Sequence, residues 1–519
     1  MPEPLASELL CTLPARISDV VKPWAKHSPD HAALVEASGT WTYGQLASAI
    51  SKTQAWLGSL GVRPGDRVMI VGENCREFVA ILLATAAIDA WPVLVNARLS
   101  AREVDQIRDH CGARCIVYTT GASPHASDHA KRHGATAEEI EKMGSIAVGS
   151  LNASVEPELI DPDISQRVAA LIYTSGTTGT PKGVMLTHRN VLFMAAGAAK
   201  IRSLTPEDRL FGVLPMTHAV GLSVVLLGSL FSGASVYLAP RFDPMTASAT
   251  LRNEKLTIML GAPATFNQFL QYAKLRGAES VKFPSLRIIS ASGAPLDAAT
   301  KSATEALFGL HLHHGYGITE CSPTIAQTRV EAPRSDLSIG PPFPGVEIKL
   351  VGPDRKSVPE GEAGELWVRG PNVMKGYYRA SEETAAAIDG EGWYNSHDLA
   401  RLEDGNLFIV GRTKDLIVHR GFNVYPAEVE AVLNAHPAVV QSAVVGRRVD
   451  GDEEVIAFVQ MSPESQLTTA DLAEYASRHL AMYKRPSEII LVTSMPLTPT
   501  GKIAKAELTK KIEFTLQSR

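Results

Sequence analysis

The stretch from Tyr173 to Gly183 holds the residues of this chain that are best suited to chemistry. It carries three glycines, five Thr or Ser hydroxyls and one lysine within eleven residues, directly after the apolar run 168–172. A strand that ends in such a loop presents backbone N–H groups, hydroxyl donors and one cation to a bound anion. Glycine also lets the backbone come close to that anion. The pattern predicts a site for a polyphosphate.

The spacing of this loop differs from that of a Walker-type phosphate loop, which requires Gly, four residues and then Gly-Lys-Ser/Thr. Here Lys182 follows Pro181 and precedes Gly183, so the required glycine and hydroxyl are both missing. A solvated Gly/Thr linker has a similar composition, but its position directly after an apolar strand argues against a linker. We therefore expect a phosphate-binding loop of another class.

Alternating apolar runs and helical patterns surround the loop. From about residue 65 to 315, short runs such as 67–71, 92–95 and 286–290 are typical of strands, with helical stretches between them. This alternation predicts an α/β fold of mainly parallel, helix-covered sheets, with binding loops at the carboxyl ends of the strands. Residues 120–165 are polar and weakly periodic, and we expect a surface excursion there.

The pattern changes twice in the last third of the chain. From 346 to 410, short strands alternate with Gly, Pro and Asp turns, which predicts a small β-rich, barrel-like subdomain. After 411–415, strands and helices alternate on a smaller scale. We predict an N-terminal domain over residues 1–412, a hinge at 413–415 and a small α+β domain over 416–519.

Whole-chain composition limits the classes of partner. A chain of 519 residues is too long for a single hydrophobic core, so we expect two or more domains. A net charge of −5 gives no electrostatic reason to expect binding of nucleic acid. No apolar run reaches membrane-spanning length, and the first residues lack a signal-peptide pattern, so we expect no integral membrane association. Five sparse cysteines indicate reduced thiols and therefore a cytoplasmic location.

Six motifs in a fixed order carry a resemblance to a known family. The loop at 173–183 is followed by Gly-Tyr-Gly-Ile-Thr-Glu at 315–320 and Gly-Trp-Tyr-Asn-Ser-His-Asp at 392–398. The series is completed by Gly-Arg-Thr-Lys-Asp at 411–415, Gly-Phe-Asn-Val-Tyr-Pro at 421–426 and Pro-Thr-Gly-Lys at 499–502. In this order and spacing the motifs resemble the adenylate-forming superfamily, and most closely its acyl-CoA synthetases and 4-coumarate–CoA ligases. The resemblance runs from about residue 30 to 510, essentially the whole chain.

The resemblance implies an ATP-dependent acid–CoA ligase. Such enzymes join a carboxylate to the α-phosphate of MgATP, release pyrophosphate, and then pass the acyl group from the acyl-adenylate to the thiol of coenzyme A. It also implies a mobile C-terminal domain that turns between the two half-reactions. The expected small-molecule partners are a carboxylic acid, ATP with Mg²⁺, and coenzyme A. The sequence leaves the oligomeric state open, with a homodimer as one option.

Each motif contributes residues to the implied nucleotide site. By resemblance, Glu320 supplies a carboxylate to Mg²⁺ and Thr319 a hydroxyl to the α-phosphate. The ring of Tyr316 would form one wall for adenine, while Gly315 and Gly317 keep the strand free of obstructing side chains. The loop residues expected to hold the β- and γ-phosphates are Thr174, Ser175, Gly176, Thr177, Thr178, Gly179 and Lys182.

Asp398 and Arg412 are implied to bind the ribose and phosphate. A carboxylate can accept hydrogen bonds from both vicinal ribose hydroxyls. The family usually has glycine where this chain has His397, so the backbone geometry of this loop is an open point. Arg412 could equally pair with Asp398 to fix the domain junction, which is compatible with nucleotide binding.

Three residues near or beyond the domain junction have implied roles in the alternation of the small domain. Lys502 would be the catalytic cation of adenylation, carried to the reacting oxygens by the small domain. Lys414 falls at the hinge. Gly421 lies in a loop that resembles the pantetheine tunnel, although a simple turn glycine is an equal alternative.

The residues implied to surround the acid are small and apolar, with no Lys or Arg among them. Such a lining favours an apolar monocarboxylate, either fatty or aromatic, because a second carboxylate would need a charged partner. His218 is expected to flank the reacting carboxylate, with a packed core histidine as the alternative. The functional alternative is an adenylating enzyme that loads a separate carrier protein. The implied segments are 193–197, 218–221, 262–265, 290–293 and 317–318.

Overall fold

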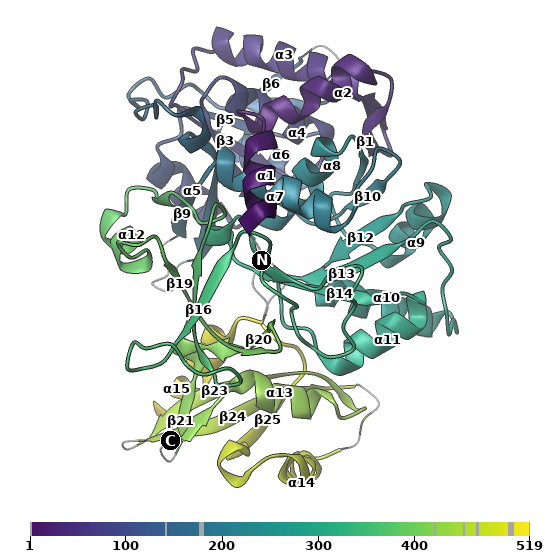
Figure 1. Cartoon of the computed structure of the whole chain (residues 1–519), viewed down its shortest axis with the longest axis vertical. Coiled ribbons are helices and arrows are strands. Elements are labelled where there is room, and N and C mark those ends of the chain that lie inside the picture. The colour runs from purple at the N-terminus through teal and green to yellow at the C-terminus, as the bar shows by residue number, and fades with distance from the viewer. Residues whose placement is uncertain are drawn as a thin grey trace.

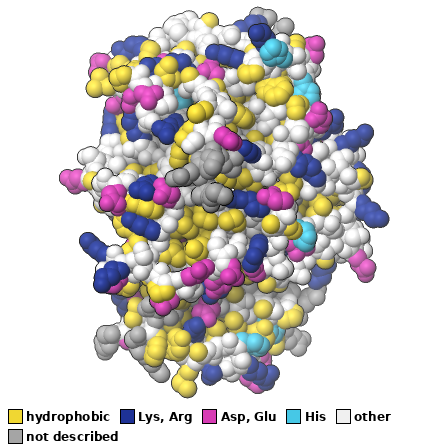
Figure 2. Space-filling view, viewed as in Figure 1, with side chains coloured by type: hydrophobic (Ala, Val, Ile, Leu, Met, Phe, Trp, Pro, Cys, Tyr) yellow, Lys and Arg dark blue, Asp and Glu magenta, His cyan; other side chains and the backbone are white. Residues whose placement is uncertain are grey.

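Two domains of unequal size make up the chain, a large layered α/β domain and a smaller C-terminal domain beside it (Figure 1). The structure is a computed structural model that describes residues 3–140, 143–175, 181–419, 422–449, 452–462, 465, 467–496 and 503–517. On the face shown in Figure 2, basic and acidic side chains intermingle over both domains. No helix in the described ranges is both long enough and apolar enough to cross a membrane.

The first sheet has six parallel strands at its centre and an antiparallel strand at each edge. Its central strands are buried and consist largely of apolar residues, as expected for parallel strands covered on both faces. In spatial order the described strands are β15 (Thr324–Gln327), β14 (Leu312–Gly317), β13 (Ile288–Ser292), β12 (Ile258–Gly261), β10 (Arg209–Gly212), β11 (Ser235–Leu238), β1 (Ala32–Glu36) and β2 (Gly39–Thr42).

The second sheet contains the strand that precedes the phosphate loop. Its four central strands β8, β4, β3 and β5 are parallel, and the remaining strands pair antiparallel. In spatial order the described strands are β18 (Gly376–Tyr377), β9 (Pro181–Thr187), β8 (Val168–Ser175), β4 (Trp91–Asn96), β3 (Arg67–Gly72), β5 (Cys115–Tyr118), β7 (Ile146–Val148) and β6 (Thr136–Glu138). The expected excursion at 120–165 therefore contributes two short edge strands to this sheet.

Helices fill the space between the sheets and cover their outer faces. The inner helices join residues of both sheets in one core, and α4 is buried along almost its whole length because it is apolar on every side. The inner elements are α3 (Tyr43–Ser59), α4 (Arg76–Ala87), α7 (His188–Ile201), the π-helical segment Val220–Leu227 and α8 (Gly228–Phe231), with α1 (Glu3–Thr12) and α2 (Lys22–His27) beside them. The outer helices are α5 (Ala101–Cys111) and α6 (Pro124–Arg132) on the second sheet, and α9 (Pro244–Asn253), α10 (Pro263–Leu275) and α11 (Ala298–Phe308) on the first.

A four-stranded antiparallel sheet follows, where the sequence predicts a β-rich subdomain. Its strands are β16 (Glu347–Val351), β17 (Gly364–Arg369), β19 (Tyr394–Glu403) and β20 (Asn406–Arg412), with α12 (Ser381–Ala387) in the connection. The last strand ends at Arg412, and a short 3₁₀ turn, Thr413–Asp415, leads into the C-terminal domain.

The C-terminal domain has helices on both faces of a three-stranded sheet. Residues of α13 and α14 pack on one face and residues of α15 on the other, as two separate apolar clusters. The elements are the pair β21 (Ile417–His419) and β22 (Phe422–Val424), the sheet β23 (Val439–Val449), β24 (Asp452–Met461) and β25 (Glu488–Val492), and the helices α13 (Pro426–Asn434), α14 (Thr469–His479) and α15 (Lys505–Gln517).

Candidate active site

The expected phosphate loop joins two antiparallel strands of the second sheet. Thr174 pairs with Lys182 and Ser175 with Pro181 in the antiparallel β8–β9 pair, so the described residues that flank the expected loop lie side by side. Thr174 and Lys182 are half-buried. Gly176, Thr177, Thr178 and Gly179 lie outside the described residues. The sequence did not indicate the returning strand β9, which fixes the register of Lys182.

Lys182 and Glu320 both contact one tyrosine, Tyr377. The ammonium of Lys182 lies 5.0 Å from the ring centroid of Tyr377, within the range of a cation–π contact. The hydroxyl of Tyr377 donates a hydrogen bond of 3.0 Å to Oε1 of Glu320. Burial raises the pKa of the Glu320 carboxyl above its ordinary value. Sequence interpretation missed Tyr377, whose nearest signal was the Gly-Tyr-Tyr run after Lys375.

The donor set around Glu320 suits magnesium held jointly with a substrate. Among the described residues, no group of three His, Cys, Asp or Glu side chains could hold a metal alone. Magnesium in phosphate-transfer sites is commonly held by one or two carboxylates together with substrate phosphates and water. Glu320 is a carboxylate that could serve in this way, directly after Thr319 on the short 3₁₀ turn that follows β14.

The two glycines of β14 differ in whether a side chain would fit in their place. A Cβ on Gly317 would lie 2.1 Å from the carbonyl oxygen of Pro323, so only glycine fits that position. A Cβ on Gly315 would meet its nearest neighbours at 3.8 Å, which is ordinary contact. The expected steric requirement therefore applies to Gly317 and not to Gly315.

Asp398 connects Tyr316 to Arg412. The Tyr316 hydroxyl donates to Oδ2 of Asp398, and Nε of Arg412 lies 2.8 Å from Oδ1. Asp398 is 2% exposed, whereas the side chain of Arg412 is 48% exposed. The junction pair considered from the sequence is present, and the Arg412 side chain is partly exposed beside it.

His397 occupies a backbone conformation that favours glycine. Its φ is +55°, in the left-handed region. The side chain is largely exposed, with Nδ1 3.3 Å from Oε1 of Glu365. The backbone N–H of His397 donates to Oδ1 of Asn395 at 2.8 Å. The backbone here therefore keeps a conformation suited to the family's glycine, and histidine, like asparagine, tolerates it better than most residues.

Asn74 holds the segment that leads to His218. It follows β3 and is buried, yet every polar atom of its amide is used. Nδ2 donates to the carbonyls of Gly212 and Leu214 at 2.9 Å, and Oδ1 accepts from the N–H of Met216 at 2.9 Å. Asn74 thereby joins the second sheet to the strand end of the first. His218 is half-buried at the start of the following helical turn.

The carboxyl ends of neighbouring parallel strands form a row of small residues. Gly212, Gly261, Ser292 and Gly317 end β10, β12, β13 and β14, which are adjacent in the first sheet. Phe193 and Gly197 behave differently, since both pack against Phe343 in the core. Of the segments that the resemblance assigns to the acid, this part of α7 is therefore core packing.

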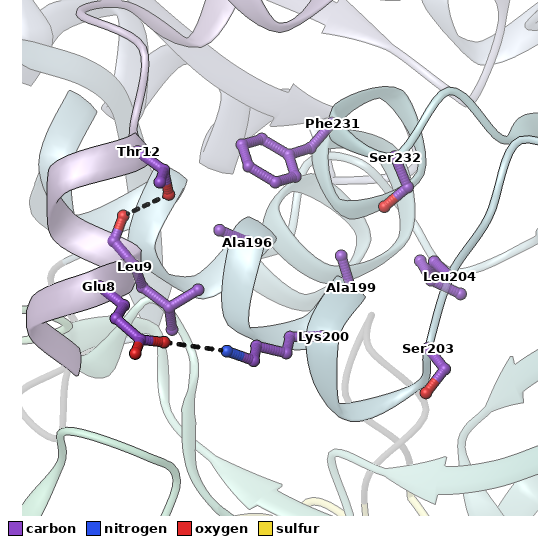
Figure 3. A pocket seen from close by; sticks show the side chains of 10 residues that line it. All are labelled: Glu8, Leu9, Thr12, Ala196, Ala199, Lys200, Ser203, Leu204, Phe231 and Ser232. Atoms are coloured by element: carbon purple, nitrogen blue, oxygen red, sulfur yellow. Dashed lines mark hydrogen bonds and ion pairs between the residues drawn. The ribbon is translucent and has the colours of Figure 1, made fainter. Parts of the chain in front are cut away.

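A groove of about 600 Å³ lies elsewhere in the large domain, between α1, α7 and α8 (Figure 3). Glu8 and Lys200 form an ion pair of 3.4 Å across one end of it. None of the expected nucleotide-binding or catalytic residues lines this groove. It therefore plays no part in the candidate site.

The remaining expected residues lie at or beyond the domain junction. Lys414 is exposed in the 3₁₀ turn between β20 and β21, where the hinge was expected. Lys502 and Gly421 lie outside the described residues. The structure thus brings Lys182 and Glu320 to the same tyrosine, and Tyr316 together with Asp398 and Arg412, from segments about 80 to 140 residues apart in sequence.

Comparison with known proteins identifies the family. The sequence model of the AMP-binding enzyme matches residues 21–378, and that of the AMP-binding enzyme C-terminal domain matches residues 428–502. Feruloyl-CoA synthase of Amycolatopsis sp is 33% identical over 493 residues, covering 94% of this chain and 97% of that protein. 4-Coumarate–CoA ligase 2 of Oryza sativa subsp. japonica is 32% identical over 528 residues, covering 94% and 91%.

A solved structure gives the same result at the level of the fold. The crystal structure of ATP-bound MatB from Rhodopseudomonas palustris superposes with a TM-score of 0.84 at 28% identity, covering 96% of this chain and 98% of that chain. The fold expected from the sequence is thereby confirmed. The chain belongs to the AMP-binding enzyme family, as an AMP-forming acid–CoA ligase of the acyl-CoA synthetase and 4-coumarate–CoA ligase type.

Proposed function

We propose that this ligase activates an apolar monocarboxylic acid, fatty or aromatic, at the carboxyl ends of β10, β12, β13 and β14. One observation carries the proposal: these strand ends are small and uncharged, and they adjoin the residues assigned to ATP. Segments 212–221, 261–265, 292–296 and 315–318 contain no Lys, Arg, Asp or Glu. A second carboxylate would be buried there without a charged partner. The aromatic acids in the names of feruloyl-CoA synthase and 4-coumarate–CoA ligase support this class.

In the first half-reaction, an oxygen of the acid attacks the α-phosphorus of ATP and the bond to pyrophosphate breaks. Such chemistry depends on positioning and on stabilising charge at the leaving group. The hairpin tip after Thr174, together with Lys182, would hold the β- and γ-phosphates, and Thr319 would contact the α-phosphate. Magnesium at Glu320 would neutralise part of the developing charge. Asp398 and Arg412 would hold the ribose beside the ring of Tyr316.

In the second half-reaction, the thiol of coenzyme A attacks the acyl carbon and AMP leaves. We assign Lys502 to the first half-reaction, Gly421 to the path of the thiol, and Lys414 to the hinge between the states. Lys502→Ala is then expected to abolish acyl-adenylate formation while sparing thioester formation from supplied acyl-adenylate. Lys414→Pro is expected to spare adenylation and block the thioester step, because proline fixes φ at the junction. Equal loss of both half-reactions in either variant would contradict the two-state assignment.

The experiment that tests the substrate class is pyrophosphate release by the purified protein with a panel of acids. The panel contains aliphatic, aromatic and dicarboxylic acids, each with coenzyme A, with a carrier protein, and with neither. We expect release with apolar monocarboxylates, and thioester product with coenzyme A. Preference for a dicarboxylate, or acyl transfer only to a carrier protein, would contradict the proposal. The homodimer and the cytoplasmic location remain predictions.

A further inference from the structure

Tyr377 lies between the two charged residues that the proposed function assigns to the triphosphate and its metal. It belongs to β18, which pairs antiparallel with β9, and it is 8% exposed. Its ring faces the Lys182 ammonium at 5.0 Å and its hydroxyl donates to Oε1 of Glu320 at 3.0 Å. One side chain therefore touches both a cation of the phosphate loop and the carboxylate assigned to magnesium.

The backbone around Tyr377 is fastened to the same two places. The N–H of Met374 donates to the carbonyl of Glu320 at 2.8 Å, and the N–H of Tyr378 donates to the carbonyl of Gly183 at 2.7 Å. Behind it, the N–H of Tyr377 donates to Oγ1 of Thr384 at 2.9 Å. The ring and hydroxyl are thus held at a fixed place between β9 and the turn that carries Glu320.

We propose that Tyr377 is a positioning residue with two separable actions, one through its hydroxyl and one through its ring. The hydroxyl orients the Glu320 carboxylate for the metal, and the ring holds the Lys182 side chain beside the hairpin before ATP binds. The inference rests on the proposed function of Lys182 and Glu320. Carboxylates that bind metals are commonly fixed by such outer hydrogen bonds, whose removal weakens metal binding roughly tenfold or more.

Two substitutions separate the actions. Tyr377→Phe removes the hydroxyl and keeps the ring, whereas Tyr377→Leu removes both. Tyr378→Phe is the matched control, because its hydroxyl bonds Glu158 on another part of the domain. The readout is equilibrium binding of ATP by titration calorimetry, once with excess EDTA and once across a Mg²⁺ series.

The expected results differ between the two variants. With Tyr377→Phe, ATP affinity in EDTA stays within about twofold of wild type, while the Mg²⁺ concentration for half-maximal enhancement of binding rises roughly tenfold. With Tyr377→Leu, ATP affinity in EDTA also falls, by roughly threefold, because Lys182 loses its cation–π contact. Tyr378→Phe matches wild type in both conditions. The unchanged metal-free affinity of Tyr377→Phe also shows that this variant is folded.

A double-mutant cycle checks that the hydroxyl acts through Glu320. In a Glu320→Gln background, Tyr377→Phe should change the Mg²⁺ dependence no further, since the carboxylate it orients is gone. Additive effects in that background, or wild-type Mg²⁺ dependence in Tyr377→Phe alone, would overturn the inference about Tyr377. If wild type itself bound no ATP, or bound it without any Mg²⁺ dependence, the proposed function of the site would fail as well.

Discussion

The hydroxyl of Tyr316 donates a hydrogen bond to Asp398, which ties β14 of the first large sheet to β19 of the four-stranded sheet. The other carboxylate oxygen of Asp398 lies 2.8 Å from Nε of Arg412. Both oxygens are therefore oriented by this chain's own side chains before a nucleotide arrives. Such preorganisation lowers the entropy lost on binding, which supports the proposed ribose site.

Substitutions at this pair should weaken ATP binding to different degrees. Asp398→Asn removes the charged carboxylate that we propose accepts hydrogen bonds from the ribose hydroxyls, so we expect ATP affinity to fall roughly tenfold or more. Tyr316→Phe keeps the ring that we propose lies beside adenine and loses the hydrogen bond to Asp398, so a fall of roughly threefold is expected. Titration calorimetry measures both. Wild-type ATP affinity in Asp398→Asn would contradict the ribose assignment.

Removal of the Asn74 amide should impair handling of the acid more than binding of ATP. Asn74→Ala leaves the Met216 N–H and two strand-end carbonyls without their present partners, which costs about 2 kcal/mol in the free energy of unfolding. The segment before His218 loses its anchor, so kcat/KM for the acid should fall severalfold. ATP affinity without acid is the internal control. A proportional loss of kcat/KM for the acid and of ATP affinity would indicate a general structural effect instead.

Glycine should be tolerated at the position of His397. His397→Gly relieves the cost of a positive φ and should raise the free energy of unfolding by up to about 1 kcal/mol, with ATP affinity unchanged. His397→Val places a β-branched residue in the same conformation and should lower it by about 1–2 kcal/mol. Denaturant unfolding of the three proteins checks the order. A less stable glycine variant would show that the exposed imidazole contributes more than its backbone costs.

Acid should destabilise the large domain through buried histidines. Burial lowers the pKa of His188 from 6.5 to about 4, and that of His313 and His314 similarly. Between these values the unfolded chain binds more protons than the folded chain, so stability falls as pH falls from about 6.5 towards 4. His188 alone should remove about 2 kcal/mol between pH 7.5 and 5.

The variant His188→Asn isolates that contribution. Asparagine keeps an acceptor for the N–H of Ile17, which now donates to Nδ1 of His188, but it cannot titrate. Its loss of stability between pH 7.5 and 5 should be smaller than that of wild type by about 2 kcal/mol, measured by denaturant unfolding at each pH. The exposed His125 provides the control, since His125→Asn should leave the difference unchanged. If His188→Asn lost as much stability as wild type between pH 7.5 and 5, the assignment of this loss to His188 would be contradicted.

Elements with strong periodicity could be predicted from the sequence. The expected strand runs 67–71 and 92–95 lie within β3 and β4, because their largely apolar residues are typical of buried strands. The edge strands β6 and β7 in the region 120–165 could not be predicted, since each has only three residues and shows no clear alternation of apolar and polar side chains. Edge pairing of this kind leaves little trace in local composition.

The residues of the candidate site also fall into two groups, those that the sequence predicts and those that only the structure shows. Glu320 and Asp398 could be predicted because they occur in motifs. Asn74 and Tyr377 could not be predicted, because each bonds to a partner more than 50 residues away in the sequence. The strand β9 pairs locally with β8, and it was not predicted because the Gly- and Thr-rich residues before it are typical of a loop. The positive φ of His397 could not be deduced from a histidine, but a family glycine at that position pointed to it.

The most direct test of the central claim follows an oxygen atom from the acid into AMP. Wild-type protein is incubated with ATP, Mg²⁺, coenzyme A and a carboxylic acid that carries ¹⁸O in both carboxylate oxygens. Attack of the carboxylate on the α-phosphorus, followed by thiolysis, must leave one ¹⁸O in the phosphate of AMP and one in the acyl-CoA. We predict that mass spectrometry finds this singly labelled AMP and unlabelled pyrophosphate. Unlabelled AMP, or label in inorganic phosphate, would contradict the account.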